Sequence, residues 1–234
     1  MKKVLLLLAA LLFTLPLLAG EPYFCTRPGT KLYYERYRAK DHKLTQTTLF
    51  EIDAYNGSQV HYAITLKKAN GSDIYGGRTL QTAYIAPNGD VAMDFGQTVK
   101  GFLRNMFSGM KITTTESRAL LPENMQPGDT LPETHCAVKI AGFSAYFDIT
   151  ERSVLRREQI TTPVGTFDCM VVRERKQENA PLHHHDNWLD NYYVPGLGYV
   201  RHDKYDKNMR LLESEVLISI EEPAAAPAAS DGQL

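Results

Sequence analysis

The sequence is poor in cysteine, has a single tryptophan and carries almost no net charge. Its three cysteines, Cys25, Cys136 and Cys169, show no Cys-x-x-Cys spacing, which gives no support for a thiol redox site or a zinc knuckle. A formal net charge of −1 at pH 7 predicts no electrostatic attraction to nucleic acid or to anionic lipid. Nucleic acid is therefore not an expected partner.

The short motifs that accompany catalysis are also missing. The sequence contains no Gly-x-Ser-x-Gly nucleophile elbow, no His-Glu-x-x-His pair and no phosphate-binding glycine loop. The glycines at Gly76-Gly77 and Gly196-x-Gly198 are not followed by a helical pattern, so we interpret them as turns. We expect a protein that is not an enzyme and needs no cofactor.

Only one long hydrophobic run occurs, and it lies near the N-terminus. A pair of lysines precedes an apolar run over residues 4–18, and the small residues Ala19 and Gly20 follow it. This order is typical of a secretory signal peptide, and the run is shorter than the roughly 20 residues of a membrane-spanning helix. We predict a signal peptide over residues 1–20 rather than a transmembrane anchor.

Export decides the expected location and the expected state of the cysteines. A lipoprotein signal would have Cys directly after Leu-Ala-Gly, but Glu21 occupies that position, so we expect no lipid anchor. The protein is expected in the periplasm or outside the cell. In such an oxidising compartment two of the three cysteines could pair and leave one free, and the sequence leaves all three pairings open.

The remainder of the chain alternates between turn residues and segments of period two, which is typical of antiparallel strands with one buried face. A single β-rich domain is predicted over residues 21–220, followed by a disordered Pro- and Ala-rich tail over residues 221–234. The fold class is all-β: an antiparallel meander that forms a strongly curved sheet or an incomplete barrel. The strands are predicted at residues 31–39, 43–54, 58–68, 73–86, 90–95, 110–119, 135–150, 152–160, 166–177, 188–194, 198–205 and 209–220.

One segment breaks the alternation. Apolar residues from Phe102 to Met110 follow helical spacing and predict a short helix over residues 98–108, lying across the sheet or over one end. A helix that caps the core is the favoured interpretation, and a mobile lid over the concave face is the alternative.

Two motifs carry a resemblance to a known family. The first is Thr161-Thr162-Pro163-Val164-Gly165-Thr166-Phe167-Asp168-Cys169, and the second runs from Trp188 to Val200 with Gly196-Leu197-Gly198 at its centre. Together with the first strand at Gly29 to Tyr34, they resemble the TapB-like family of exported bacterial proteins of unknown function, related to the domain-of-unknown-function family three-one-zero-eight. The resemblance implies a curved antiparallel sheet or incomplete barrel in the cell envelope, and it brings no reaction or ligand.

The run His183-His184-His185-Asp186 is the one cluster with metal-binding chemistry. Neutral imidazoles bind Zn, Ni or Cu, but adjacent residues of a strand point to opposite faces, so three consecutive histidines do not easily serve one ion. The candidate metal ligands are therefore His183 and His185, with His202 across a hairpin. The favoured interpretation of this run is an exposed polar loop, which Pro181 and the polar residues at 176–179 indicate, and the metal site is the alternative.

Aromatic residues are abundant inside the predicted strands, where they stabilise cross-strand pairs and could also line an apolar cleft. The candidate ligand-binding residues are Tyr62, Phe102, Phe107, Tyr146, Trp188 and Tyr193.

Three functions follow from these observations. The first is a non-enzymatic envelope protein that binds an apolar small molecule or lipid in the curved sheet. The second is a structural or assembly factor that contacts an envelope protein through an exposed sheet edge. The third is a metal-binding protein that uses the histidine cluster.

Overall fold

The computed structural model describes residues 20–115, 117–180 and 183–223, and of His183 it describes the backbone alone. The predicted signal peptide lies almost entirely outside the described residues, as does most of the predicted tail. The elements are β1 (Lys31–Arg38), β2 (Lys43–Tyr55), β3 (Gln59–Lys68), β4 (Thr79–Ile85), β5 (Val91–Asp94), α1 (Phe95–Met106), β6 (Ile112–Thr114), β7 (Arg118–Leu121), β8 (Thr134–Ile140), β9 (Phe143–Thr162), β10 (Gly165–Ala180), β11 (His183–Val194), β12 (Gly198–Tyr205) and β13 (Leu211–Glu221).

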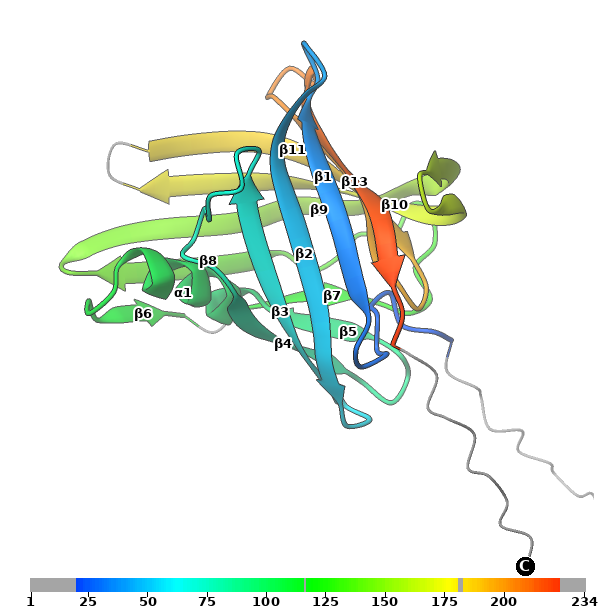
Figure 1. Ribbon diagram of the computed structural model, residues 1–234, viewed down its shortest axis with the longest axis horizontal. Coiled ribbons are helices and arrows are strands. Elements are labelled where there is room, and N and C mark those ends of the chain that lie inside the picture. The colour runs from blue at the N-terminus through cyan, green and yellow to red at the C-terminus, as the bar shows by residue number, and fades with distance from the viewer. Residues whose placement is uncertain (1–19, 116, 181–182, 224–234) are drawn as a thin grey trace, which may run out of the picture.

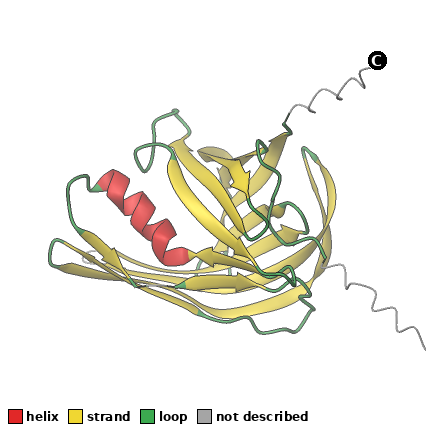
Figure 2. Ribbon diagram, turned by 90° about the horizontal axis from the view of Figure 1, so that it is seen from below, coloured by secondary structure: helices red, strands yellow, loops and turns green. Residues whose placement is uncertain are grey.

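The strands of the described chain form one antiparallel sheet in the order β6-β8-β9-β10-β11-β12-β13-β1-β2-β3-β4-β5-β7. Most neighbours in the sheet are also neighbours in sequence, as in a meander, and the first strand pairs with the last. The all-β prediction is confirmed: the sheet is strongly curved and does not close. In Figure 1 strands β1–β3 cross in front of β8–β11, and Figure 2 shows the sheet curled into a trough.

The chain crosses between the two edges of the sheet three times, from β5 through α1 to β6, from β6 to β7 and from β7 to β8. β5 and β7 lie at one edge, and β6 and β8 lie at the other. Thr115 and Ser117 lie in the segment that crosses from β6 to β7. Thr115 N donates to Ala137 O at 3.0 Å, and Ser117 O accepts from Phe95 N at 2.9 Å. Thr134 Oγ1 of β8 also donates to Arg118 O of β7, at 3.2 Å. These bonds hold the open seam together without a continuous ladder.

Helix α1 lies within the trough (Figure 2). It begins after Asp94, whose side chain accepts a hydrogen bond from Gln97 N, a standard N-cap. Val99 of the helix packs with Ile112, Cys136 and Val138 in a small core on β6 and β8, separate from the main core. The helix thus packs on the concave side of the sheet, and the choice between a core cap and a mobile lid stays a prediction.

The segment before β1 fills the end of the trough opposite the helix. Gly196 N donates to Pro22 O at 2.7 Å, which fastens this segment to the turn between β11 and β12. Tyr23 and Phe24 are buried, and their rings meet Tyr193 and Tyr62, respectively, edge to face. The segment therefore belongs to the main core.

Several predicted strand limits were wrong. The prediction placed a break at Glu151, whereas the chain turns at Ala141–Gly142, where both residues have positive φ as a two-residue hairpin turn requires. β9 runs through Glu151, which sits with positive φ at an irregularity of its pairing with β10. A β-bulge within a strand and a turn between two strands can both place polar residues in the sequence. Only the pairing with the neighbouring strand distinguishes a bulge from a turn.

The segment predicted as one strand over residues 110–119 forms two strands, β6 and β7, at opposite edges of the sheet. The strand predicted over residues 73–86 begins only at Thr79. The polar segment from His183 to Asp186 was interpreted as a loop, but it extends β11 and pairs with the end of β10. The main-chain hydrogen bonds between β10 and β11 do not depend on apolar side chains. The alternation of apolar and polar residues therefore did not predict this part of β11.

The three cysteines are free thiols, and all three are buried. Cys25 and Cys169 lie in the main core, and Cys136 lies in the small core beneath the helix. The structure therefore contains none of the three disulfide pairings that the sequence left open.

Candidate functional site: an aromatic cavity inside the rolled sheet

A cavity of about 220 Å³ lies on the concave face of the sheet. Strands from both halves of the trough contribute to its wall, together with the segment before β1 and the start of α1. Most lining side chains are apolar or aromatic: Tyr23, Phe24, Cys25, Leu32, Tyr34, Phe50, Ile52, Tyr62, Ile64, Met93, Phe95, Ala119, Leu121, Ile149, Tyr193, Leu197 and Tyr199.

The aromatic side chains of this wall contact one another in a continuous cluster. The rings of Tyr34 and Tyr199 stack at 4.8 Å, and Phe50 meets Tyr199 edge to face at 5.9 Å. Tyr62 contacts both Phe50, at 6.1 Å, and Phe24, at 5.1 Å. Burial raises the pKa of Tyr34, Tyr62 and Tyr199, so their hydroxyls stay protonated at neutral pH. The wall is aromatic and uncharged over this area.

A row of polar residues crosses the concave face beside the aromatic cluster. Direct cross-strand pairing aligns one residue from each of five adjacent strands, in the order Gln46, Arg36, Glu215, His202 and Asn191. Arg36 Nη2 lies 2.9 Å from Glu215 Oε2. Thr48, next to the row, donates to the other Glu215 oxygen at 2.5 Å.

Two charges of the row compensate each other. Burial disfavours the Glu215 carboxylate, but the Arg36 guanidinium overrides this and holds the pKa of Glu215 below its usual value. His202 lies between Glu215 and Asn191, and burial lowers its pKa to about 4, with Arg36 adding to the effect. At neutral pH the row therefore contains one ion pair and a neutral imidazole.

Asn191 ends the row and lines the cavity. Its Oδ1 lies 2.6 Å from Nδ1 of the neutral His202, so the imidazole donates and the amide oxygen accepts. Its Nδ2 is buried and has no hydrogen-bond partner among the described residues. Buried donors are nearly always paired in folded proteins, which makes this amide an exception.

A second polar pair, Arg152 and Glu174, also lies in the wall of the cavity. Arg152, 2% exposed, donates from Nε to Glu174 Oε2 at 3.2 Å. Its Nη1 donates to two main-chain oxygens, Leu120 O at 3.1 Å and Pro132 O at 2.8 Å. This guanidinium closes the seam of the sheet and neutralises Glu174.

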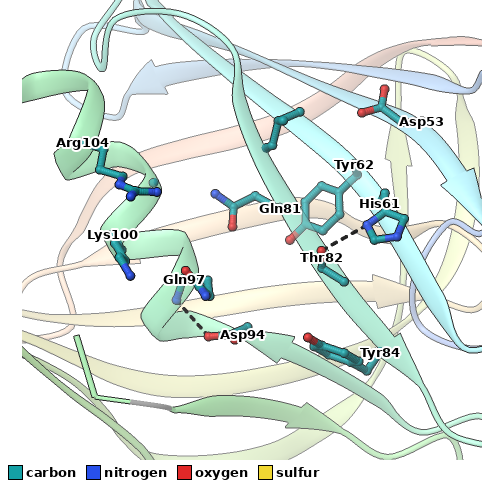
Figure 3. Close-up of a pocket in the computed structure, with 12 residues that line it drawn as sticks. Asp53, His61, Tyr62, Gln81, Thr82, Tyr84, Asp94, Gln97, Lys100 and Arg104 are labelled. Atoms are coloured by element: carbon teal, nitrogen blue, oxygen red, sulfur yellow. Dashed lines mark hydrogen bonds between the residues drawn. The ribbon is translucent and has the colours of Figure 1, made fainter. Parts of the chain in front are cut away.

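A larger and more polar cleft of about 480 Å³ lies between α1 and the neighbouring strands (Figure 3). Lys100 and Arg104 come from one side of the helix, and His61 and Thr82 come from β3 and β4 and share a hydrogen bond. Tyr62 lines both this cleft and the internal cavity. Tyr62 is therefore shared by the walls of the two spaces.

Two of the six predicted ligand-binding residues, Tyr62 and Tyr193, line the cavity. Phe102 packs beside the main core and against Tyr75, at 4.7 Å. Phe107 ends the helix at the surface, and Tyr146 is half exposed. Trp188 lies over Arg175, whose guanidinium carbon is 5.9 Å from the ring centroid. The structure does not bring these four residues to the cavity.

The three predicted metal ligands are not brought together. His202 pairs with Asn191, six residues along β11 from His185, and six strand residues span about 20 Å. The side chain of His183 lies outside the described residues. Among the residues that the structure describes, no group of three His, Cys, Asp or Glu side chains is arranged to hold a metal ion.

Little in the sequence indicated the residues that make part of the cavity wall polar. Arg36, Asn191 and Glu215 lie in strands without any recognisable motif. The only indication of a role was that each is a polar residue at a position where the alternation places side chains on the buried face. Their alignment depends on the pairing of strands that are far apart in the chain.

The fold and cavity define a class of protein, a rolled antiparallel sheet with a helix in its trough. The chain belongs to the DUF3108-like family, whose pattern matches residues 27–217. This confirms the family relationship that the motifs indicated. No curated protein matches the sequence.

Two solved structures share the fold. One is a candidate lipoprotein from Parabacteroides distasonis, 22% identical, with a TM-score of 0.69 over 86% of this chain and 99% of that one. The other is a candidate exported protein with a YmcC-like fold from Bacteroides fragilis, 21% identical, with a TM-score of 0.68 over 87% of this chain and 100% of that one. Within the described residues, no helix is both long and apolar enough to cross a membrane.

Proposed function

We propose that this protein is an exported, non-enzymatic binding protein of the cell envelope that holds a small apolar ligand inside the rolled sheet. The observation that carries the proposal is the cavity of about 220 Å³ with its cluster of aromatic walls. Support for export comes from the N-terminal sequence pattern and from the two structural relatives, which are described as a candidate exported protein and a candidate lipoprotein.

The volume limits the size of the ligand. An apolar cavity of about 150 Å³ is large enough to bind benzene. Pockets for drug-sized molecules are larger, roughly 300 to 1,000 Å³. The cavity, at about 220 Å³, lies between these sizes. It fits a substituted aromatic ring or a short part of an acyl chain, and a complete phospholipid would need a much larger space.

Binding through a sheet edge has less support. Strand addition needs a long unpaired edge, and the edge strands of the described sheet are short. β6 has three residues and β7 has four. The cavity is therefore the better candidate for the binding site.

The test is native mass spectrometry of the mature protein purified from its own envelope, before and after extraction with organic solvent. We expect an additional mass that extraction removes. The mass of the chain itself also tests the expectation that processing near Glu21 leaves no lipid anchor. A bare protein in both samples, together with no binding of added ethylbenzene, would contradict the proposal.

Replacing each of two buried alanines by leucine tests where the ligand binds. Ala119 lines the cavity, so Ala119→Leu fills empty space and should abolish binding of ethylbenzene with little loss of stability. Ala83 is also buried but does not line the cavity, so Ala83→Leu should overpack the core and cost about 1 to 3 kcal/mol. The folded Ala83→Leu protein should still bind. Equal binding by the Ala119→Leu protein would place the ligand elsewhere.

A further inference from the structure

The unpaired amide of Asn191 gives the cavity a specific chemical preference. Asn191 is 5% exposed and lines the cavity, and its Nδ2 lacks a partner among the described residues. A buried N–H group without an acceptor is unfavourable, and a ligand that supplies the acceptor removes this penalty. The wall of the cavity, otherwise mainly aromatic and apolar, therefore contains a buried donor without a partner among the described residues.

The orientation of this amide is fixed by its neighbours. His202 Nδ1 lies 2.6 Å from the amide oxygen, and His202 is in turn paired across the sheet with Glu215. Glu215 is bound by Arg36 and Thr48. The neutral imidazole therefore acts as a positioning residue that keeps Asn191 Oδ1 occupied and leaves Nδ2 for a ligand.

The charges around the cavity favour a neutral ligand group. Glu174 lines the cavity on β10, where Asn191 pairs with Val172, so Glu174 is a diagonal neighbour of Asn191 about 7 Å away. Among the described lining residues the only cation is Arg152, and its guanidinium is engaged by Glu174, Leu120 O and Pro132 O. A carboxylate ligand would meet Glu174 without a free cation to neutralise it.

We propose that the ligand carries an uncharged hydrogen-bond acceptor, a carbonyl oxygen of the ketone, ester or amide class, and that Asn191 Nδ2 donates to it. This inference rests on the proposed function, because it assigns the polar group of the same ligand. The apolar part of the ligand lies against the aromatic cluster, and the carbonyl lies at the polar row.

The test compares two probes of nearly the same shape, acetophenone and ethylbenzene, by titration calorimetry on the mature protein. Asn191→Leu should weaken the binding of acetophenone by about tenfold relative to the binding of ethylbenzene, which is the loss of affinity expected for one hydrogen bond. Asn187→Leu is the matched control, since Asn187 is buried on the same face of β11 but does not line the cavity. It should leave the ratio of the two affinities unchanged.

A spectroscopic measurement keeps the test independent of whether the variant folds. The infrared carbonyl stretch of acetophenone bound to the unmodified protein should shift to lower frequency than in an alkane solvent. If both probes bind, an unshifted stretch or an unchanged ratio in folded Asn191→Leu would overturn the inference and leave the proposed function standing. If neither probe binds, the proposed function itself fails. Tighter binding of benzoate than of acetophenone at neutral pH would overturn the choice of an uncharged group.

Discussion

Arg152 Nη1 of β9 lies 3.1 Å from the carbonyl oxygen of Leu120 on β7, and this bond joins the two sides of the open seam. An edge strand presents main-chain oxygens that need donors, and here a buried side chain supplies one. Glu174 balances the charge of Arg152 in the same place. The incomplete barrel is therefore closed by a guanidinium where a strand ladder is missing.

Replacing Arg152 should destabilise the fold strongly. Arg152→Ala leaves the Glu174 carboxylate buried without its partner and two main-chain oxygens without donors, and removing one partner of a buried pair typically costs about 3 to 5 kcal/mol. Urea denaturation measures the loss. Arg156→Ala is the control, because Arg156 pairs with Glu158 at the surface and should change stability by at most about 1 kcal/mol. Similar losses in the two variants would show that Arg152 does not close the seam.

His202 should make the fold less stable as the pH falls. Its pKa is lowered from 6.5 to about 4 in the folded protein, so between these values the unfolded chain binds more protons than the folded one. The contribution of His202 to the free energy of unfolding is fully present above pH 6.5 and decreases as the pH falls towards 4. At pH 4.5 the loss should be about 2 to 3 kcal/mol.

The measurement is the free energy of unfolding of the unmodified protein and of His202→Gln at several pH values from 7.5 to 4.5. Glutamine does not titrate and can still donate to Asn191, so the difference between the two curves isolates the imidazole. A difference that stays constant with pH would mean that His202 is protonated as readily in the folded protein as in the unfolded chain.

The three thiols should be unreactive in the native protein. Each cysteine is buried and therefore hard for a reagent to reach. Burial also raises the pKa of Cys136 and raises that of Cys169 to about 12, so almost no Cys169 thiolate forms at pH 8. Labelling with iodoacetamide, followed by intact mass, should add nothing to the folded protein and three groups after denaturation. Detection of a single added group under denaturing, non-reducing conditions would indicate a disulfide.

Gly101 should be needed for the close contact between α1 and β4. A methyl group at this position would lie 2.7 Å from Thr79 Cγ2 and 3.0 Å from Gln81 Nε2, both on buried side chains. Gly101→Ala should therefore destabilise the protein by about 1 to 2 kcal/mol, although alanine favours a helix by about 1 kcal/mol. Thermal unfolding beside Gln97→Ala, at an exposed site of the same helix, measures the difference. A higher melting temperature for Gly101→Ala would show that the contact can relax.

Much of the fold follows from local patterns. The alternation over residues 58–68 predicted β3 to within one residue, since one buried face is enough to specify a strand. The helix was predicted over residues 98–108 and occurs at Phe95–Met106. The division of residues 110–119 between two sheet edges was not predicted, because each edge strand is only three or four residues long and its partner lies in another part of the chain.

The candidate site divides in the same way. Tyr62 and Tyr193 were singled out because they are aromatic residues in strands, and both reach the cavity. Phe107 and Tyr146 have the same local signal but lie at the surface. Composition identifies side chains that suit an apolar wall, whereas the direction of each side chain depends on the register of its strand.

The amino-acid sequence by itself determined the all-β class, the approximate positions of most strands and the absence of the familiar catalytic motifs, because these depend on the spacing of residues along the chain. Only the tertiary structure decided that Arg36, Glu215, His202 and Asn191 form one row, and that Arg152 closes the seam. Arg36 and Glu215 are 179 positions apart and Arg152 and Leu120 are 32 apart, whereas His202 and Asn191 lie on consecutive strands. The geometry of all these contacts is set by the pairing and curvature of the whole sheet.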